Sequence, residues 1–438
     1  MNVDEDEEEE KKSVVHKPNI TVKVTKSKPS KLIPTAPSGL IPDEHITDFQ
    51  LLDELFSILD ADQHGEEPEP ILCGYFQKIV QALLGKIKNK ILYYILVKRE
   101  GDIFRKLTQH MQHHSLAQLL VELMQVELPS QWDISGEKDS DEDEDAVSKH
   151  EETTAEVTAK IKALNEIFNH CRQEVITTLI DHLGPKNADL ENTLNAQLVL
   201  TELVENKKIY KRITEGQNIT KLINFACEMR NVNQAYALNV LTLILKEFTT
   251  FDLSKDSEEF NEIRLSMQKS FLDVTYSCLL ILRASDSQLG EEPLPEKLNQ
   301  AGVEFKRFGA KRMRSLELLK QIIATLSMNG DVNLTSIIST ILKRQILNTL
   351  LQTIEDYEFS NVAGQISIQV LHSLKSIFDD ADLEQLKEFV RKHLSTHEQT
   401  HFQFESGNTT TKGHLASIIH MAIELRKMTI DGGLLNVK

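Results

Sequence analysis

Hydrophobic residues recur at helical spacing between Pro68 and Met124, and this pattern limits the chain to a helical fold. In the first helical segment the apolar residues fall at positions i, i+4, i+7, i+8, i+11 and i+12, which is one face of a helix. These residues are Leu72, Phe76, Ile79, Val80, Leu83 and Leu84. A second stripe consists of Leu116, Leu119, Leu120, Leu123 and Met124. Neither helix is long enough to be stable alone, so each must bury its apolar face against neighbours.

Turn residues separate the helical segments. Gly101 and Asp102 are expected to end one helix and to begin the next. Ser115 and Gln118 have the spacing of a capping box, which predicts the start of the helix that carries the second stripe. The sequence shows no strand-like alternation between these helices.

The same plan continues downstream, where amphipathic segments follow one another from Ala155 with polar turns between them. No strict sequence repeat is visible. A succession of helices of about 10 to 20 residues with short connections is nevertheless typical of helical-repeat proteins. We therefore predict an all-α chain that forms an α-solenoid of armadillo or HEAT type, with an irregular helical domain as the alternative.

Two stretches are predicted to be disordered. Residues 1–42 contain the acidic run from Asp4 to Glu10 and five of the eleven prolines, a composition that cannot bury enough surface to fold. Residues 129–154 contain a second acidic run, whose like charges repel one another. The helical-repeat domain is therefore expected over residues 43–430, with the acidic insert inside it. Ser140 stands directly before acidic residues and is a candidate phosphorylation site, although the insert could equally be a solubilising loop.

Charge and composition exclude several classes of protein. The chain has 49 Lys and Arg against 67 Asp and Glu, and its net charge of −18 argues against nucleic-acid binding. No apolar run reaches the length of about 18 residues that a membrane span needs, and the acidic N-terminus does not resemble a signal peptide. The four cysteines lack metal-site spacing and are predicted to be buried free thiols. We expect a cytoplasmic or nucleocytoplasmic protein with no membrane partner.

The sequence offers little catalytic chemistry. It contains no glycine-rich phosphate loop, nucleophile elbow, HExxH motif or paired-aspartate motif. His110, His113 and His114 have a spacing that could place them on a metal-binding face. No further ligand is fixed near them, so histidines at a helix junction are the favoured interpretation. We expect a protein that is not an enzyme and that holds no cofactor.

Two basic clusters stand out against the acidic background. The first lies between Lys207 and Arg212, and the second lies between Lys306 and Arg314. Either cluster could contact an acidic partner surface, and an ordinary polar helix face is the alternative. Gly309 lies where a tight turn would begin the next helix.

A series of short motifs follows a fixed order between Leu51 and Leu415. The motifs are Leu51–Ser57, Leu72–Val80, His110–Gln112, Phe308–Leu318, Tyr357–Asn361 and Gly413–Leu415. Together they resemble the SAPS-domain family, the regulatory subunits of protein phosphatase 6. Gln112 stands where the family has a glycine, and the acidic, proline-rich stretch stands where the family has its first helices. The chain thus resembles a divergent member with an atypical N-terminus.

The resemblance implies a non-catalytic regulatory or scaffold subunit. Such a subunit binds the catalytic subunit of a type 2A-class Ser/Thr phosphatase, directs its substrate choice or location, and binds further adaptor proteins. The residues that we predict to bind the partner are Gly309, Lys311, Arg312, Glu317, Tyr75 and Phe76. We expect charge reversal at Lys311 and Arg312 to weaken this binding without unfolding the chain. A helical-repeat adaptor for trafficking or cytoskeletal assembly is the main alternative, and a degenerate enzyme is a third.

Overall fold

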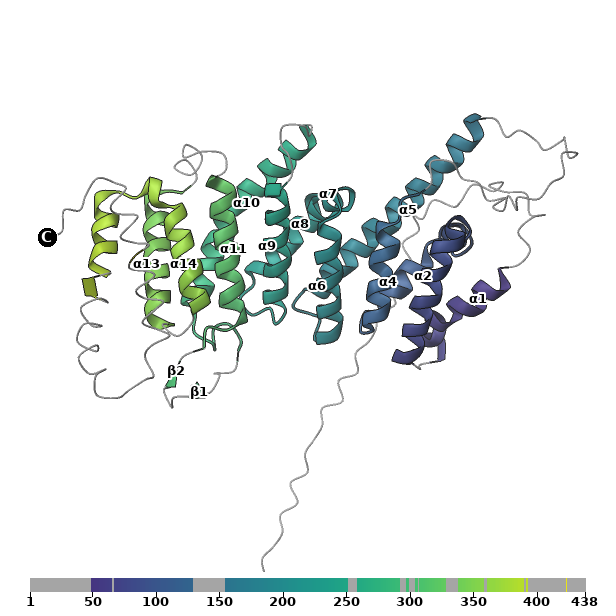
Figure 1. Cartoon of the computed structure of the whole chain (residues 1–438), viewed down its shortest axis with the longest axis horizontal. Helices are drawn as coiled ribbons and strands as arrows, with labels where there is room; N and C mark the ends of the chain where they lie inside the picture. Colours follow the sequence, from purple (N-terminus) through teal and green to yellow (C-terminus); the bar gives the residue numbers. More distant parts are fainter. Residues whose placement is uncertain are drawn as a thin grey trace, which may run out of the picture. The chain divides into compact units, whose positions relative to one another are not determined.

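The computed structural model consists almost entirely of helices (Figure 1). The structure describes residues 49–64, 67–128, 154–250, 258–291, 297–298, 304–305, 307–327, 338–357, 361–389, 391–392 and 423. Within these ranges the strands are β1 (Lys297–Leu298) and β2 (Glu304–Phe305), which form one antiparallel pair. The predicted all-α class is therefore confirmed. The tail predicted over residues 1–42, the insert up to residue 153, and Ser140 lie outside the described residues.

The helices follow one another with mostly short connections. In chain order they are α1 (Gln50–Phe56), the 3₁₀ segment η1 (Ser57–His64), α2 (Pro70–Tyr93), the π-helical segment η2 (Tyr94–Lys98), α3 (Asp102–Gln109), α4 (His114–Gln125), α5 (Thr154–His182), α6 (Leu190–Val204), α7 (Lys207–Thr214), α8 (Gly216–Cys227), α9 (Gln234–Thr250), α10 (Glu258–Arg283), α11 (Ala310–Ser327), α13 (Thr340–Asp356), α14 (Asn361–Ser373) and the 3₁₀ segment η3 (Lys375–Ile377). Residues 380–389 are also helical.

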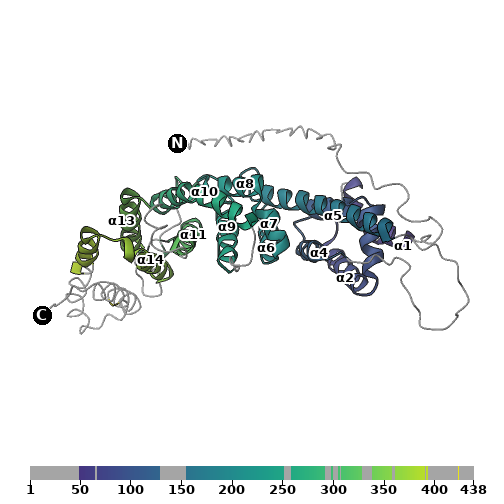
Figure 2. The same ribbon diagram turned by 90° about the horizontal axis from the view of Figure 1, so that it is seen from above.

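The larger helices pack in two rows. The first row consists of α2, α4, α6, α9, α11 and α14, and each of these contacts the next. The second row consists of α3, α5, α8, α10 and α13, which also contact one another in order. Figure 2 shows the rows as two layers. Helices adjacent in the sequence, such as α5 and α6 or α8 and α9, pack against each other across the rows. Each helix thus buries its apolar stripe between the layers, and the buried side chains form one cluster from Phe49 to Phe389.

Local signals define several helix ends. The Asp189 side chain accepts hydrogen bonds from the first amides of α6, and Asn206 and Ser339 cap α7 and α13 in the same way. Gly101, with a φ of 75°, separates η2 from α3, as the sequence predicts. The predicted capping box at Ser115 is wrong, because α4 already begins at His114 and makes no side-chain cap.

Three hydrogen bonds join later parts of the chain to earlier connections between helices. The Asn195 side chain of α6 donates to the carbonyl of Met111, just before α4, over 2.7 Å. Asn233, just before α9, donates to the carbonyl of Gly184, just after α5, over 3.0 Å. Lys311 of α11 donates to the carbonyl of Met229, between α8 and α9, over 3.4 Å. These three ties, which we call the connection ties, fix the helix ends relative to one another.

Candidate protein-interaction surface

Helix α2 carries apolar residues on two sides, and only one side is buried. Phe76 and Val80 are buried, and the ring of Phe76 meets that of Phe56 edge-on with 5.3 Å between centroids. Gln77 faces α4 and donates to Gln118 over 3.1 Å. The predicted stripe is therefore correct at Phe76 and Val80, but it is wrong at Leu72 and Ile79, which are exposed. Spacing could not separate the two sides because both are apolar.

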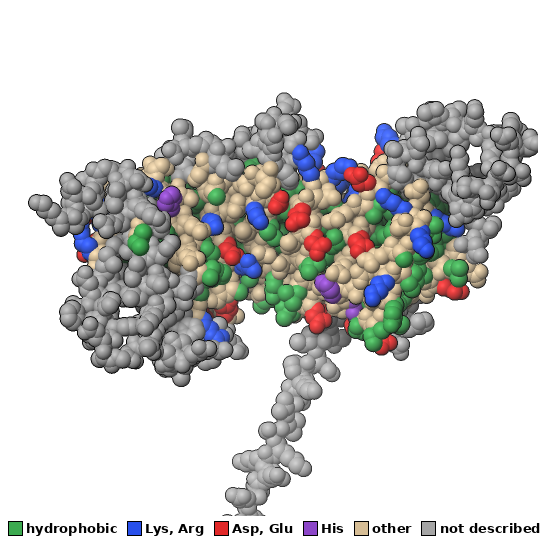
Figure 3. All heavy atoms as spheres, in the orientation of Figure 1, with side chains coloured by type: hydrophobic (Ala, Val, Ile, Leu, Met, Phe, Trp, Pro, Cys, Tyr) green, Lys and Arg blue, Asp and Glu red, His purple; other side chains and the backbone are tan. Residues whose placement is uncertain are grey.

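The other side of α2 is an uncovered apolar surface. Ile71, Leu72, Tyr75 and Ile79 have exposed fractions of 64%, 47%, 60% and 46%. We call these four residues the α2 face. Their spacing places them on one side of the helix, and Figure 3 shows hydrophobic side chains gathered in the region where Figure 1 places α2. Contiguous exposed apolar patches mark interaction sites in soluble proteins.

A second uncovered apolar patch lies further along the first row. Leu190 and Leu194 of α6 are 55% and 44% exposed, and Val232, just before α9, is 62% exposed. We call these three residues the α6 patch. The hydrogen bond from Asn233 to Gly184 brings the chain around Val232 to the connection that precedes α6. Apolar side chains are thus uncovered on more than one helix of the same row.

The residues predicted from the sequence to bind a partner fall into two groups. Tyr75 is exposed and belongs to the α2 face, while Phe76 next to it is buried. Gly309 has a φ of 79° directly before α11, so the predicted tight turn is confirmed. Glu317 is half-buried and accepts a hydrogen bond from Arg314 over 2.7 Å.

The prediction that Lys311 and Arg312 form an exposed basic surface is wrong. Their exposed fractions are 5% and 1%. Arg312 donates to the carbonyls of Ala284 and Phe308 over 2.7 and 3.1 Å. Lys311 donates to the carbonyl of Leu289 over 2.6 Å, and burial lowers the pKa of its ammonium group. Both cations therefore stabilise the connection after α10, whose carbonyl groups need donors once they are buried.

The first basic cluster is also not a uniform face. Lys207 and Lys208 at the start of α7 are exposed, and Lys208 pairs with Glu127 over 2.6 Å. Tyr210 is buried, and its hydroxyl donates to the carbonyl of Ile244 over 3.1 Å. This cluster therefore combines a surface ion pair with a core residue.

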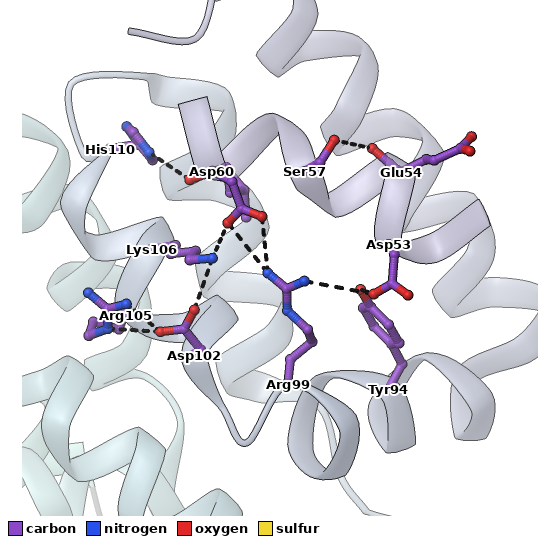
Figure 4. A network of polar contacts seen from close by, with 11 residues as sticks. Asp53, Glu54, Ser57, Asp60, Tyr94, Arg99, Asp102, Arg105, Lys106 and His110 are labelled. Carbon is purple, nitrogen blue, oxygen red and sulfur yellow. Dashed lines mark hydrogen bonds and ion pairs between the residues drawn. The ribbon is translucent and has the colours of Figure 1, made fainter. Parts of the chain in front are cut away.

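A polar network that the sequence did not reveal joins the elements from α1 to α3. Figure 4 shows Asp60 of η1 between Lys106 of α3 and Arg99, and Lys106 also pairs with Asp102 over 3.0 Å. Burial alone would raise the pKa of Asp60, but the bonds and charges of Lys106 and Arg99 outweigh burial and lower it. Tyr94 donates to the Asp53 carboxylate over 2.6 Å in the same network. These contacts hold α1 and η1 against η2 and α3.

The histidines of the predicted junction lie between α3 and α4. His110 is buried, with its Nε2 atom 3.3 Å from the carbonyl oxygen of Leu59 (Figure 4). Burial lowers the pKa of His113, and the nearby His110 lowers it further. Within the described ranges, no group of three or more His, Cys, Asp or Glu residues could hold a metal ion. His110 therefore contributes to packing between η1 and the start of α4.

All four cysteines are free, and Cys73, Cys171 and Cys278 are buried as predicted, whereas Cys227 is half-buried. Among the helices described, none is long and apolar enough to cross a membrane.

The chain matches no family model, and no curated protein or solved structure is significantly similar to it.

Proposed function

We propose that this chain is a non-catalytic α-solenoid of armadillo or HEAT type that binds a partner protein through the first row of its helices. The main helix contacts run between successive members of each row and between sequence neighbours across the rows, as in a stack of helix pairs. Such stacks present extended surfaces on which several helices contribute side chains to one partner.

The observation that carries the proposal is the α6 patch. Leu190 and Leu194 lie one turn apart on α6 and are each about half exposed, whereas Val199, Leu200 and Leu203 of the same helix are buried. Apolar side chains gain free energy when a partner removes them from water, at roughly 25 cal/mol per Å². Hydrogen bonds from Asn233 to the carbonyls of Gly184 and Asn187 hold the segment with Val232 at the connection before α6, so one partner can contact α6 and the start of α9.

The resemblance to regulatory subunits of protein phosphatase 6 supplies the proposed partner. That partner is the catalytic subunit of a type 2A-class Ser/Thr phosphatase, whose substrate choice or location this chain directs. Further adaptor proteins are proposed to bind other parts of the rows. Catalytic groups and metal ions then belong to the partner. A trafficking or cytoskeletal adaptor is the second candidate, and it uses the same stack with a different partner.

Affinity purification with mass spectrometry tests this function. The tagged chain is purified from its own cells beside a Leu190→Glu/Leu194→Glu variant and a control. Leu280→Glu on α10 is the matched control, because Leu280 is 58% exposed and lies in the second row. We expect a phosphatase catalytic subunit to copurify with the wild type and the control, and to fall at least about tenfold with the double variant.

Two outcomes would contradict the proposal at different points. If no phosphatase catalytic subunit is enriched with the wild-type chain, the proposed partner is wrong. If a phosphatase is enriched equally with the double variant, the partner is supported but the α6 patch is not its binding site.

A further inference from the structure

Helix α2 occupies the end of the first row. Each of α4, α6, α9 and α11 contacts one first-row helix on either side, whereas α2 contacts α4 as its row neighbour. Within the described residues, no first-row helix precedes α2. The side of α2 that would face such a neighbour is therefore available to bind another molecule.

The composition of this side is suited to another helix. Ile71, Tyr75 and Ile79 repeat every four residues, and Leu72 lies one turn before Phe76 on the edge nearest the core. Lys78, Ala82 and Lys86 are exposed and share the same side by their spacing. An apolar strip with this spacing is the surface that packs into the groove of a neighbouring helix.

Opposite charges mark the two ends of the strip. Glu67 and Glu69 are exposed at the amino-terminal end of α2, and Lys86 and Lys90 are exposed towards its carboxyl-terminal end. Glu69 and Lys86 are about 25 Å apart along an ideal helix axis. A helix of the same sequence that runs in the opposite direction presents lysines to the glutamates and glutamates to the lysines.

We propose that a second copy of this chain covers the α2 face, with the two α2 helices packed antiparallel about a twofold axis. A twofold interface is self-complementary, so one surface must supply both members of every pair. An axis level with residue 77 brings Tyr75 of one copy opposite Ile79 of the other, and it brings Glu69 to within one residue of Lys86. The surface involved is distinct from the α6 patch, so the inference goes beyond the proposed partner binding.

The small size of this interface predicts its affinity class. A single helix pair buries less area than the standard interface of about 1,600 Å². The copies should therefore associate at micromolar rather than nanomolar concentrations. Lys78 lies near the axis, and its long side chain can keep the ammonium group in solvent at the edge of the helix pair.

Sedimentation velocity over a concentration series of the full-length chain tests the association. We expect the wild type to change from monomer to dimer as its concentration rises through the micromolar range. Ile79→Glu should raise the dissociation constant at least about tenfold, because it buries a carboxylate at the centre of the apolar strip. Leu280→Glu should leave the dissociation constant unchanged, since Leu280 lies on α10. Circular dichroism should show all three proteins equally folded.

A charge exchange tests the antiparallel direction. Glu67→Lys/Glu69→Lys and Lys86→Glu/Lys90→Glu should each weaken self-association, because like charges then face each other across the twofold axis. Mixed in equal amounts, the two variants should form a heterodimer that native mass spectrometry detects. One variant then has lysines at both ends of α2 and the other has glutamates at both ends, so opposite charges face each other at each end of the helix pair.

Three results would overturn the proposal. A wild-type chain that stays monomeric at all concentrations leaves the α2 face to another protein or to another segment of this chain. A dimer that Ile79→Glu does not weaken uses a different surface. A mixture of the charge variants that stays monomeric excludes the antiparallel arrangement.

Discussion

Arg312 and Asp286 form a salt bridge of 2.6 Å in which only 2% of the Arg312 side chain is exposed. The same guanidinium group satisfies the carbonyls of Ala284 and Phe308 and lies near the ring of Tyr357, with 5.6 Å from its central carbon to the ring centroid. One side chain of α11 therefore holds the end of α10 and the turn at residue 309 together.

Replacement of Arg312 should unfold the chain more readily rather than affect partner binding alone. Arg312→Ala leaves Asp286 and two carbonyls without their donor, so we expect a loss of about 3 kcal/mol in the free energy of unfolding. Urea denaturation followed by circular dichroism measures this loss. Arg314→Ala is the control, because Arg314 is 42% exposed and its pair with Glu317 should contribute less than about 1 kcal/mol. Equal stability of the two variants would show that the buried contacts do not hold the connection.

Gly101 should tolerate no side chain. Its φ of 75° disfavours any L-residue, and a Cβ atom there would collide with the sulfur of Cys171. We expect Gly101→Ala to destabilise the chain by about 3 kcal/mol, from backbone strain and overpacking together. Thermal denaturation of Gly101→Ala/Cys171→Ala should show part of this loss recovered, because the second change removes the sulfur.

Gly85 provides the matched glycine control. It lies in α2, and a Cβ atom there would meet no atom within 4 Å. Gly85→Ala should therefore leave stability unchanged or raise it by up to about 1 kcal/mol. A Gly101→Ala variant as stable as Gly85→Ala would contradict the close approach of Gly101 to Cys171.

Asn233 should be essential to the connection between α8 and α9. Its side chain donates to Gly184 over 3.0 Å and to Asn187 over 2.7 Å, and only 4% of Asn233 is exposed. Asn233→Ala leaves two carbonyls without a donor and should cost about 2 kcal/mol. Hydrogen exchange should show faster exchange of the amides at the starts of α6 and α9. Asn224→Ala, at an exposed position of α8, should change stability by less than about 0.5 kcal/mol.

Stability should fall as the pH drops from about 7.5 to 5.5. Burial lowers the pKa of both His113 and His182 below the ordinary value of 6.5, and the charge of His110 adds to the effect at His113. Between the folded and unfolded pKa values the unfolded chain binds more protons, so acidification favours unfolding there. Urea unfolding at pH 7.5, 6.5 and 5.5 measures the slope, which His182→Gln should reduce.

The carboxylates act in a separate pH window. The pKa of Asp60 lies below its usual value of 3.8, so the stability contributed by its ion pairs is present above that value. This stability should be lost only as the pH falls through the folded pKa of Asp60.

The prediction for His113 and His182 has its own contradicting outcome. An unfolding free energy that stays constant between pH 7.5 and 5.5 would show that the buried histidines do not contribute.

The sequence predicts the helical class because every segment must bury a stripe with helical spacing. All five apolar residues of the second stripe, from Leu116 to Met124, are fully buried, so this prediction is confirmed. Spacing fails on α2 because Leu72 and Ile79 have the same chemistry as their buried neighbours. It fails at Lys311 and Arg312 because a basic residue at the start of a helix can serve either solvent or a buried carbonyl. The network around Asp60 joins residues about 40 positions apart, and only the packing of α3 brings them together.

The connection ties have a direction along the chain. In each of them the donor side chain lies later than the carbonyl that accepts its hydrogen bond, as with Asn195 and Met111 or Lys311 and Met229. During synthesis on the ribosome, each carbonyl therefore leaves the exit tunnel before the segment that carries its donor. These three ties can form as each later segment emerges, whereas the bond from Tyr210 to the carbonyl of Ile244 forms only after α9 has been made. The connection ties thus favour docking of later helices onto N-terminal helices that have already emerged during translation.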